Sequence, residues 1–279
     1  MCLDDSCVTG VIVNGTERID SGTVVLAIGH SARDTFEMLY KKQIPMEAKS
    51  FAVGLRMEHP RKMIDRMQYG QEENPLLPAA NYKVTAQTSS GRGVYSFCMC
   101  PGGYVVTASS EPGRLAVNGM SYSGRDGDNS NSAMIVTVTP EDYENKSPLA
   151  GIAFQRKLEE NAYRIGAGAV PVETYGDYRL AVTGKVIEPS AIRQDYPDFM
   201  PQIKGAYHMA SVHDILPKTL NVALVEGIDL IGQTMRGFAD SGTYLSGIES
   251  RTSSPVRIMR DETGQSASCL STGRYPEAA

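Results

Sequence analysis

Short strand candidates separated by glycine-containing turns occupy the middle of the chain, and they constrain its fold more than any other feature. They cover residues 81–86, 94–98, 104–109, 115–118 and 133–138. Strands this short and this closely spaced leave no room for the crossover helices of a parallel sheet. The spacing therefore predicts an α+β fold whose main sheet is antiparallel.

Helices and longer strands are expected on both sides of this region. Strands are predicted at 51–58, 242–249 and 255–259, and helices at 61–67, 149–166 and 219–235. The helix at 149–166 has Phe154, Leu158 and Ala162 four residues apart, on one face. The proline-rich stretch 171–201 is expected to be mostly loop, and Ser211–Asp214 is a second capping-box pattern that would start a helical hairpin broken at Pro217.

The N-terminal part predicts a hairpin, a buried strand and a helix. Residues 8–13 and 16–19 flank Asn14-Gly15, a strong two-residue turn signal. The apolar run 24–27 is typical of a strand covered on both faces in a parallel sheet. Ser31 and Asp34 form a capping-box pattern, so a helix is expected from Ser31 to about Lys42.

Ser31 also raises the alternative of a serine hydrolase. The sequence Gly29-His30-Ser31-Ala32-Arg33 nearly matches the nucleophile elbow G-x-S-x-G. The match fails at Arg33, because that position of the tight elbow must be small. His208 and His213 lie downstream, but nothing in the sequence connects either one to Ser31. The capping box explains Ser31 better than the nucleophile does.

Composition excludes several other classes. The 279 residues carry a net charge of -5, which argues against nucleic acid or an anionic membrane as the main partner. No apolar run approaches the roughly 20 residues that span a bilayer. The five cysteines and the absence of a signal-like N-terminus favour reduced thiols in the cytoplasm, and the four histidines show no metal-ligand spacing.

The strand end at Gly29 also fits a nucleotide-binding domain. Residues 23–29, TVVLAIG, have the form of a late strand in a flavin-binding Rossmann-type lobe, where Gly lets backbone approach the cofactor. The stretches VVLAIGHSARDTFEML, AKSFAVGLRMEHP, GRGVYSFCMCPGG, GRLAVNGMSYSGRDG, NSAMIVTVTPEDY, PLAGIAFQRKLE and GIESRTSSPVRIMRDE make the match specific. Through them the chain resembles the C-terminal portion of the bacterial FAD-dependent, or NAD(FAD)-utilising, dehydrogenases.

The resemblance implies a two-part flavoprotein with FAD as cofactor and NAD(P) as a possible second one. Residues 1–45 would be a fragment of the FAD lobe, 46–245 an inserted substrate domain, and 246–279 a return to the FAD lobe. The G-x-G-x-x-G turn is absent from this sequence, and the ending SCLSTGRYPEAA departs from the family pattern. We therefore expect a truncated or frameshifted Rossmann remnant, and a chain that alone binds FAD poorly and is inactive.

Site residues follow from the same resemblance. Ala27, Gly29 and His30 would lie beside the cofactor, and His30 sits where a helix dipole lowers an imidazole pKa. The loop Arg251-Thr252-Ser253-Ser254 would contact the flavin, and Arg251 is a candidate catalytic residue that binds substrate carboxylate or reduced flavin. An ordinary polar turn is the alternative.

Cys98 and Cys100 are the other catalytic candidates. Their spacing predicts one shared strand face, from which a thiol would act as an acid in flavin chemistry, although a structural cysteine pair is the better explanation of the pattern. Arg56, Glu58 and His59 are expected to be surface or interface charges. Asn118, Arg125 and Asp126 lie near glycine-rich turns as weaker candidates for binding a polar substrate.

Two function classes therefore remain beside the hydrolase. The first is an FAD-dependent oxidoreductase that transfers hydride between a small-molecule substrate and FAD. The second is a non-catalytic binding or assembly domain. An incomplete sheet would expose strand edges, so homodimerisation or aggregation is expected.

Overall fold

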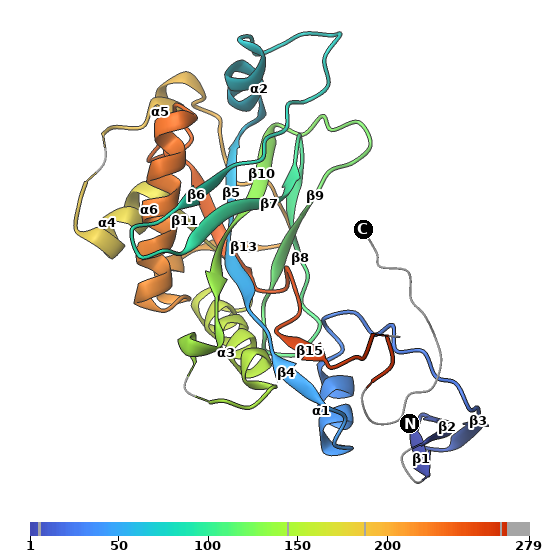
Figure 1. The fold of residues 1–279 in the computed structure, drawn as a ribbon. Helices are drawn as coiled ribbons and strands as arrows, with labels where there is room; N and C mark the ends of the chain where they lie inside the picture. The colour runs from blue at the N-terminus through green and yellow to red at the C-terminus, as the bar shows by residue number, and fades with distance from the viewer. Residues whose placement is uncertain (5–6, 144, 187, 263, 267–279) are drawn as a thin grey trace. The chain divides into compact units, whose positions relative to one another are not determined.

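A computed structural model of the chain describes residues 1–4, 7–143, 145–186, 188–262 and 264–266. The chain forms two compact units (Figure 1). Unit 1 comprises Met1–Ser50, Thr139–Ala153 and Ser253–Ala279, and unit 2 comprises Phe51–Val138 and Phe154–Thr252.

A seven-stranded sheet forms the centre of unit 2. Its order is β13-β11-β14-β5-β10-β7-β6, and every pair is antiparallel except β13 with β11. The strands are β5 (Phe51–Pro60), β6 (Thr85–Gln87), β7 (Gly93–Cys100), β10 (Asn129–Val138), β11 (Val170–Thr174), β13 (Tyr207–Met209) and β14 (Tyr244–Glu249). The predicted mainly antiparallel sheet with flanking helices is confirmed.

A second, three-stranded sheet and a long helix flank this sheet. The small sheet has the order β12-β8-β9, with β8 (Tyr104–Thr107), β9 (Val117–Met120) and β12 (Ile203–Lys204). Helix α6 (Lys218–Thr234) packs against β6, β7 and β10. Figure 1 shows α6 and β9 on opposite sides of the central strands. The remaining helices of this region are α2 (Arg61–Tyr69), α3 (Ala150–Ile165), α4 (Tyr175–Thr183), α5 (Ala191–Asp195) and η2 (Val212–Asp214).

The two faces of β5 have different chemistry, because alternate side chains of a strand point to opposite sides. One face carries Val53, Leu55 and Met57, all almost fully buried. Burying each such side chain contributes about 2 kcal/mol. The other face carries Arg56 and Glu58, also fully buried. Unit 2 is thus built around an apolar layer and a polar layer.

Close packing of α6 onto the sheet depends on Gly227. A Cβ at this position would lie 2.4 Å from the Cβ of Val94 in β7. The glycine lets the helix backbone approach the strand, which explains why a residue of poor helix propensity stands in the middle of α6.

The described residues of unit 1, the smaller unit, form two antiparallel sheets. The strands β1 (Cys2–Asp4), β2 (Cys7–Val13) and β3 (Glu17–Asp20) form one, so the predicted hairpin is confirmed, and β4 (Met46–Ala48) pairs with β15 (Val256–Ile258) in the other. Its helices are α1 (Arg33–Lys41) and η1 (Pro140–Asp142). Phe36, Ile152 and Val256 form a small apolar core.

The predicted parallel-sheet strand at 24–27 is wrong. These residues are in no β-ladder, and Val25 is 52% exposed. A continuous apolar run forms such a strand only with a hydrogen-bonded neighbour and cover on both faces, and the described part of unit 1 supplies no parallel pair. The Rossmann remnant is therefore not confirmed.

Both predicted capping boxes are also wrong. Helix α1 begins after Ala32 without a side-chain cap, and the Ser31 hydroxyl instead lies 2.9 Å from Nδ1 of the adjacent His30. Ser211 likewise makes no side-chain cap at η2. Since the same residue types also bond locally in turns, the sequence pattern alone does not fix a cap.

The stretch 171–201 is more regular than expected. It contains most of β11 together with α4 and α5, where Thr174 and Ser190 cap the helices by accepting from Asp177 N and Arg193 N. Pro189 and Pro197 flank α5, where they interrupt no internal hydrogen bond, and Pro171 is the second residue of β11. The predicted tail anomaly falls on residues 267–279, outside the described residues.

Candidate functional site

Arg56 is the centre of the polar layer in unit 2. Its side chain is fully buried, and its Nε donates to Glu249 Oε2 at 2.6 Å. Nη2 donates to Asn118 Oδ1 at 2.7 Å, while Nη1 donates to the carbonyl of Cys98 at 2.7 Å and to Asn131 Oδ1 at 3.2 Å. One guanidinium therefore joins β5, β7, β9, β10 and β14. The expectation that Arg56 is a surface charge is wrong.

Gly119 in β9 makes this arrangement sterically possible. A Cβ there would lie 2.7 Å from Arg56 Nη1 and 2.5 Å from Asn131 Oδ1. The backbone of β9 thereby covers the guanidinium directly, and any larger residue would displace it.

A β-bulge in β7 exposes the Cys98 side chain and brings its backbone carbonyl to Arg56. The β10–β7 register shifts between Asn131 and Ala133, and Cys98 has a φ of 44°. This left-handed backbone is unusual for a residue with a side chain. It turns the Cys98 carbonyl inward, where it accepts from Arg56 and, at 3.3 Å, from Cys100 Sγ. Bulges of this kind are frequent next to active sites.

The bulge separates the two candidate thiols. Cys98 is exposed whereas Cys100 is buried, so the expected shared face is wrong. Burial raises the pKa of the Cys100 thiol to about 11. Of the two, Cys98 is the thiol that solvent and ligands reach.

Glu58 and His59 are buried as well, contrary to the expected surface position. Asn129 Nδ2 and the Gln202 backbone N–H donate to Glu58 Oε2 at 3.0 and 2.9 Å, yet burial still raises its pKa to about 7. His59 Nε2 lies 2.7 Å from the Phe238 carbonyl, and burial lowers the pKa of this imidazole to about 4. Burial also raises the pKa of Glu249 to about 6, in spite of the Arg56 guanidinium.

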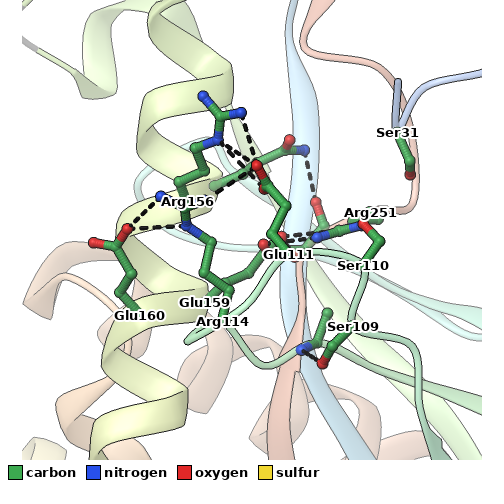
Figure 2. A network of polar contacts seen from close by, with 12 residues as sticks. Ser31, Ser109, Ser110, Glu111, Arg114, Arg156, Glu159, Glu160 and Arg251 are labelled. Carbon is green, nitrogen blue, oxygen red and sulfur yellow. Dashed lines mark hydrogen bonds and ion pairs between the residues drawn. The ribbon is translucent and has the colours of Figure 1, made fainter. Parts of the chain in front are cut away.

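Arg251 lies in a second polar network, which Figure 2 shows. Its Nε and Nη2 form a two-pronged ion pair with the buried Glu159 of α3, at 3.0 and 2.8 Å, and Nη1 donates to the Ser110 hydroxyl. Ser250 Oγ also donates to Glu159, at 2.6 Å. The Arg251 guanidinium, which the sequence predicts to bind an anion, is therefore already paired with the Glu159 carboxylate.

The network continues along α3 through alternating charges. Arg156 donates to Glu111 at 2.8 Å, and Arg114 bridges Glu111 and Glu160 at 3.1 and 2.8 Å (Figure 2). These ion pairs fasten the segment after β8 to α3.

Two other residues of the predicted cofactor loop 251–254 donate hydrogen bonds to backbone carbonyls of their own unit. Thr252 Oγ1 donates to the Ala52 carbonyl within unit 2, and Ser254 Oγ donates to Val256 O within unit 1, both at 2.8 Å. Ser253 is half-buried.

The residues of unit 1 that were predicted to bind the cofactor are exposed to solvent. Gly29 has a φ of 66°, and nothing lies within 4 Å of the position that its Cβ would take. Ala27 and His30 are exposed beside it. This glycine could admit a ligand closely, although the residues described here do not form the glycine-rich phosphate turn of a dinucleotide cradle.

The glycine-rich turns pack against each other. A Cβ at Gly102 would lie 1.9 Å from the Arg125 carbonyl, and Gly127 N donates to Gly102 O at 3.1 Å. Arg125 and Asp126 are exposed there, whereas Asn118 is bonded to Arg56. The three weaker candidates therefore do not form one site.

His213 is placed by Glu173 and not by a serine. Its Nδ1 lies 2.8 Å from Glu173 Oε1, and its backbone N–H donates to Glu173 Oε2 at 3.0 Å. Within the described ranges no group of three or more His, Cys, Asp or Glu is arranged to hold a metal ion. None of the described helices is long and apolar enough to cross a membrane.

A pocket of about 300 Å³ lies at α2 and the segment after it, and no residue of β7 is among its lining residues. Arg61, Asp65, Glu72 and Glu73 are among its lining residues. Asp65 is already held by Arg61 at 3.2 Å and by the Ala80 backbone N–H at 2.7 Å. None of the cofactor-binding or catalytic residues predicted from the sequence lines this pocket.

These features define a mixed α/β domain with a buried polar layer and a displayed thiol. The model of the family described as FAD-dependent protein, C-terminal domain-like, matches residues 50–252. The chain belongs to this family. An uncharacterized protein of Clostridium beijerinckii is 44% identical over 276 residues, which cover 98% of this chain and 50% of that relative. The chain thus spans about half the length of the relative.

Sequence reasoning missed the Arg56–Glu249 pair and the Glu159–Arg251 pair. The partners are 193 and 92 residues apart, so no local pattern connects them. The sequence does contain one indication of this site. Arg56 and Glu58 are alternate residues of an otherwise apolar strand, so their side chains face the same side.

Proposed function

We propose that this chain is the C-terminal portion of an FAD-dependent oxidoreductase that moves hydride between a small-molecule substrate and FAD. NAD(P) is a candidate second cofactor, and the cytoplasm is the proposed location. The family match over residues 50–252 carries the proposal, because it coincides closely with unit 2. FAD would supply the redox chemistry, while the protein positions the reactants.

The proposed division of labour assigns cofactor contact to the chain ends and substrate contact to the middle. Residues 1–45 and 246–279 would belong to the FAD lobe, with Ala27, Gly29 and His30 beside the cofactor. The open left-handed glycine supports this assignment. The described residues alone do not fit a complete FAD site, since they lack a phosphate cradle.

Cys98 is the proposed proton donor among the candidate catalytic residues. It is exposed on the bulge, whereas the buried Cys100 has a pKa of about 11 and holds its proton too tightly. Arg251 is proposed as a positioning residue, because its guanidinium already pairs with Glu159 and orients Ser110. Ser250–Ser254 would then shape the site by backbone position.

A non-catalytic assembly domain is the second candidate. The edge strand β13 exposes Tyr207 by 39% and Met209 by 50%. Such an edge can pair with another strand.

A chimera tests the first proposal. The aligned 276-residue segment of the Clostridium beijerinckii protein would be replaced by the matching segment of this chain, and flavin reduction by NADH and NADPH would be followed anaerobically. Retained reduction supports an oxidoreductase. A chimera that binds FAD but is reduced by neither nucleotide, under conditions that reduce the parent, contradicts it.

The Cys98 role has its own matched control. Cys98→Ser in the chimera should slow turnover with a changed pH profile, whereas Ser109→Ala should leave both unchanged. An unchanged profile for Cys98→Ser would exclude the thiol as proton donor.

A further inference from the structure

The polar layer of unit 2 contains one more buried acidic group than buried base. Glu58 and Glu249 both lie on the face of the sheet that carries Arg56, and Glu249 takes the ion pair at 2.6 Å. In the described part of the chain, Glu58 is bonded to no cation; its donors are the Asn129 amide side chain and the Gln202 backbone N–H. An ionised carboxylate without a cation is costly in a dry interior, so the layer is electrically neutral only if it holds one proton.

The hydrogen bonds of Glu58 indicate which oxygen carries that proton. Oε2 accepts from Asn129 Nδ2 and from Gln202 N, which is the pattern of a carbonyl-type oxygen. Oε1 is buried and has no hydrogen-bond partner in the structure. A protonated carboxyl group would place its O–H at Oε1, and this donor then needs an acceptor.

Two further buried polar atoms on the same face lack partners. These are Asn131 Nδ2 and Ser246 Oγ. Asn131 lies directly opposite Glu58 on β10, and Ser246 lies opposite Arg56 on β14, one step along the same face. Cross-strand and diagonal neighbours of this kind have Cβ atoms about 5–8 Å apart, and their side chains extend from the same face, so their polar ends are within reach of one shared water molecule.

We propose that Glu58, Asn131 and Ser246 enclose an internal water-binding site, and that the layer stores one exchangeable proton on Glu58 Oε1. Each of the three buried atoms without a partner then gains a hydrogen bond. The water accepts from Glu58 O–H and Asn131 N–H and donates to Ser246 Oγ, within the two to four partners of a typical buried water. When the proton leaves, the water reverses and donates to Oε1. The inference does not depend on flavin chemistry.

The surroundings leave Glu58 as the group that holds the proton. Asn131 on β10 and Tyr244 on β14 lie opposite Glu58, and Asn129 and Gln202 donate to it. Arg56 is its neighbour on the same face of β5, with Ser246 opposite Arg56 and Glu249 opposite Gly54. Glu249 is bonded to the guanidinium, which favours its ionised form. Cys100 and Tyr82 hold their protons to higher pH, with pKa values of about 11 and 12. His59 is out of phase with Glu58 along β5 and points to the opposite face.

Infrared spectroscopy of the purified chain tests the stored proton. At about pH 6, exposed carboxyl groups are ionised, so the C=O stretch of a protonated carboxyl group reports buried acids. We expect this band in the wild type, a shift of the band on ¹³C-glutamate labelling, and its loss or reduction in Glu58→Gln. Absence of the band from the wild type, or its full retention in Glu58→Gln, overturns the stored proton.

The water has separate tests. Ser246→Ala should shift the frequency of the band, because the water loses an acceptor. The control Thr243→Ala removes another buried hydroxyl without a partner, which is out of phase with Ser246, and should leave the band unchanged. A high-resolution crystal structure should show a water within hydrogen-bond distance of all three atoms; an empty site there, or direct contact between the three side chains, overturns it.

Discussion

At the scale of single residues, Glu58 and His59 are neighbours in β5 whose pKa values shift in opposite directions for the same reason. Burial disfavours the charged form of each, so the pKa of Glu58 rises from 4.5 to about 7 and that of His59 falls from 6.5 to about 4. The folded state keeps both groups neutral near pH 6, and ionising either one costs stability.

Glu58→Gln should change how stability depends on pH. Between pH 4.5 and about 7 the folded state holds a proton on Glu58 that the unfolded state releases, so this residue lowers the free energy of unfolding as pH rises. Relative to the wild type, the variant should gain about 3 kcal/mol across this window. Urea unfolding at a series of pH values measures the difference. Glu160→Gln, in an exposed ion pair with Arg114, should change stability by less than about 1 kcal/mol.

His59→Gln should gain stability relative to the wild type as pH falls, whereas Glu58→Gln gains it as pH rises. As pH falls from 6.5 to about 4, the unfolded state binds a proton that folded His59 does not, and the wild type loses stability. Over this pH range, His59→Gln should lose about 3 kcal/mol less of its free energy of unfolding than the wild type loses. Parallel curves for variant and wild type would show that His59 titrates normally in the folded protein.

These residues also show where sequence reasoning stops. The strands β5 and β7 and the helices α3 and α6 were predictable, because their periodicity is local. The burial of Arg56 and Glu58 was not, since it depends on Glu249, Asn129 and Asn131 from other strands. For the candidate site, Cys98 could be named from the sequence, but the bulge that exposes it depends on its pairing with β10.

At the scale of elements, the β7 bulge should make the two neighbouring thiols react differently. Cys98 is exposed, whereas Cys100 is buried with a pKa of about 11. Iodoacetamide at neutral pH should therefore alkylate Cys98 within the folded chain and reach Cys100 only after denaturation, as peptide mass mapping can measure. Equal labelling of both would mean that the bulge opens in solution.

The α6–β7 contact gives a second prediction at this scale. Gly227→Ala should destabilise by about 1–3 kcal/mol, because overpacking against Val94 outweighs the better helix propensity of alanine. Adding Val94→Ala should relieve the clash, so the double variant should lose less than the two single variants predict together. Strict additivity in denaturant unfolding would argue against the contact.

At the scale of the whole molecule, the edges of the seven-stranded sheet predict self-association. Strands β13 and β6 end the sheet, and Tyr207 and Met209 are exposed on β13. Sedimentation should show dimers or larger species that Met209→Lys reduces, while the control Met259→Lys, on β15's C-terminal side in unit 1, should not. A wild type that stays monomeric at all concentrations contradicts this expectation.

FAD titration tests the central claim, that this chain is the C-terminal portion of an FAD-dependent enzyme, most directly. It would compare the chimera, the parent Clostridium beijerinckii protein and the isolated chain by quenching of flavin fluorescence. The account predicts stoichiometric binding by the chimera and the parent, and much weaker binding by the chain alone. A folded chimera that binds no FAD, beside a parent that does, would contradict the assignment and favour the assembly-domain alternative.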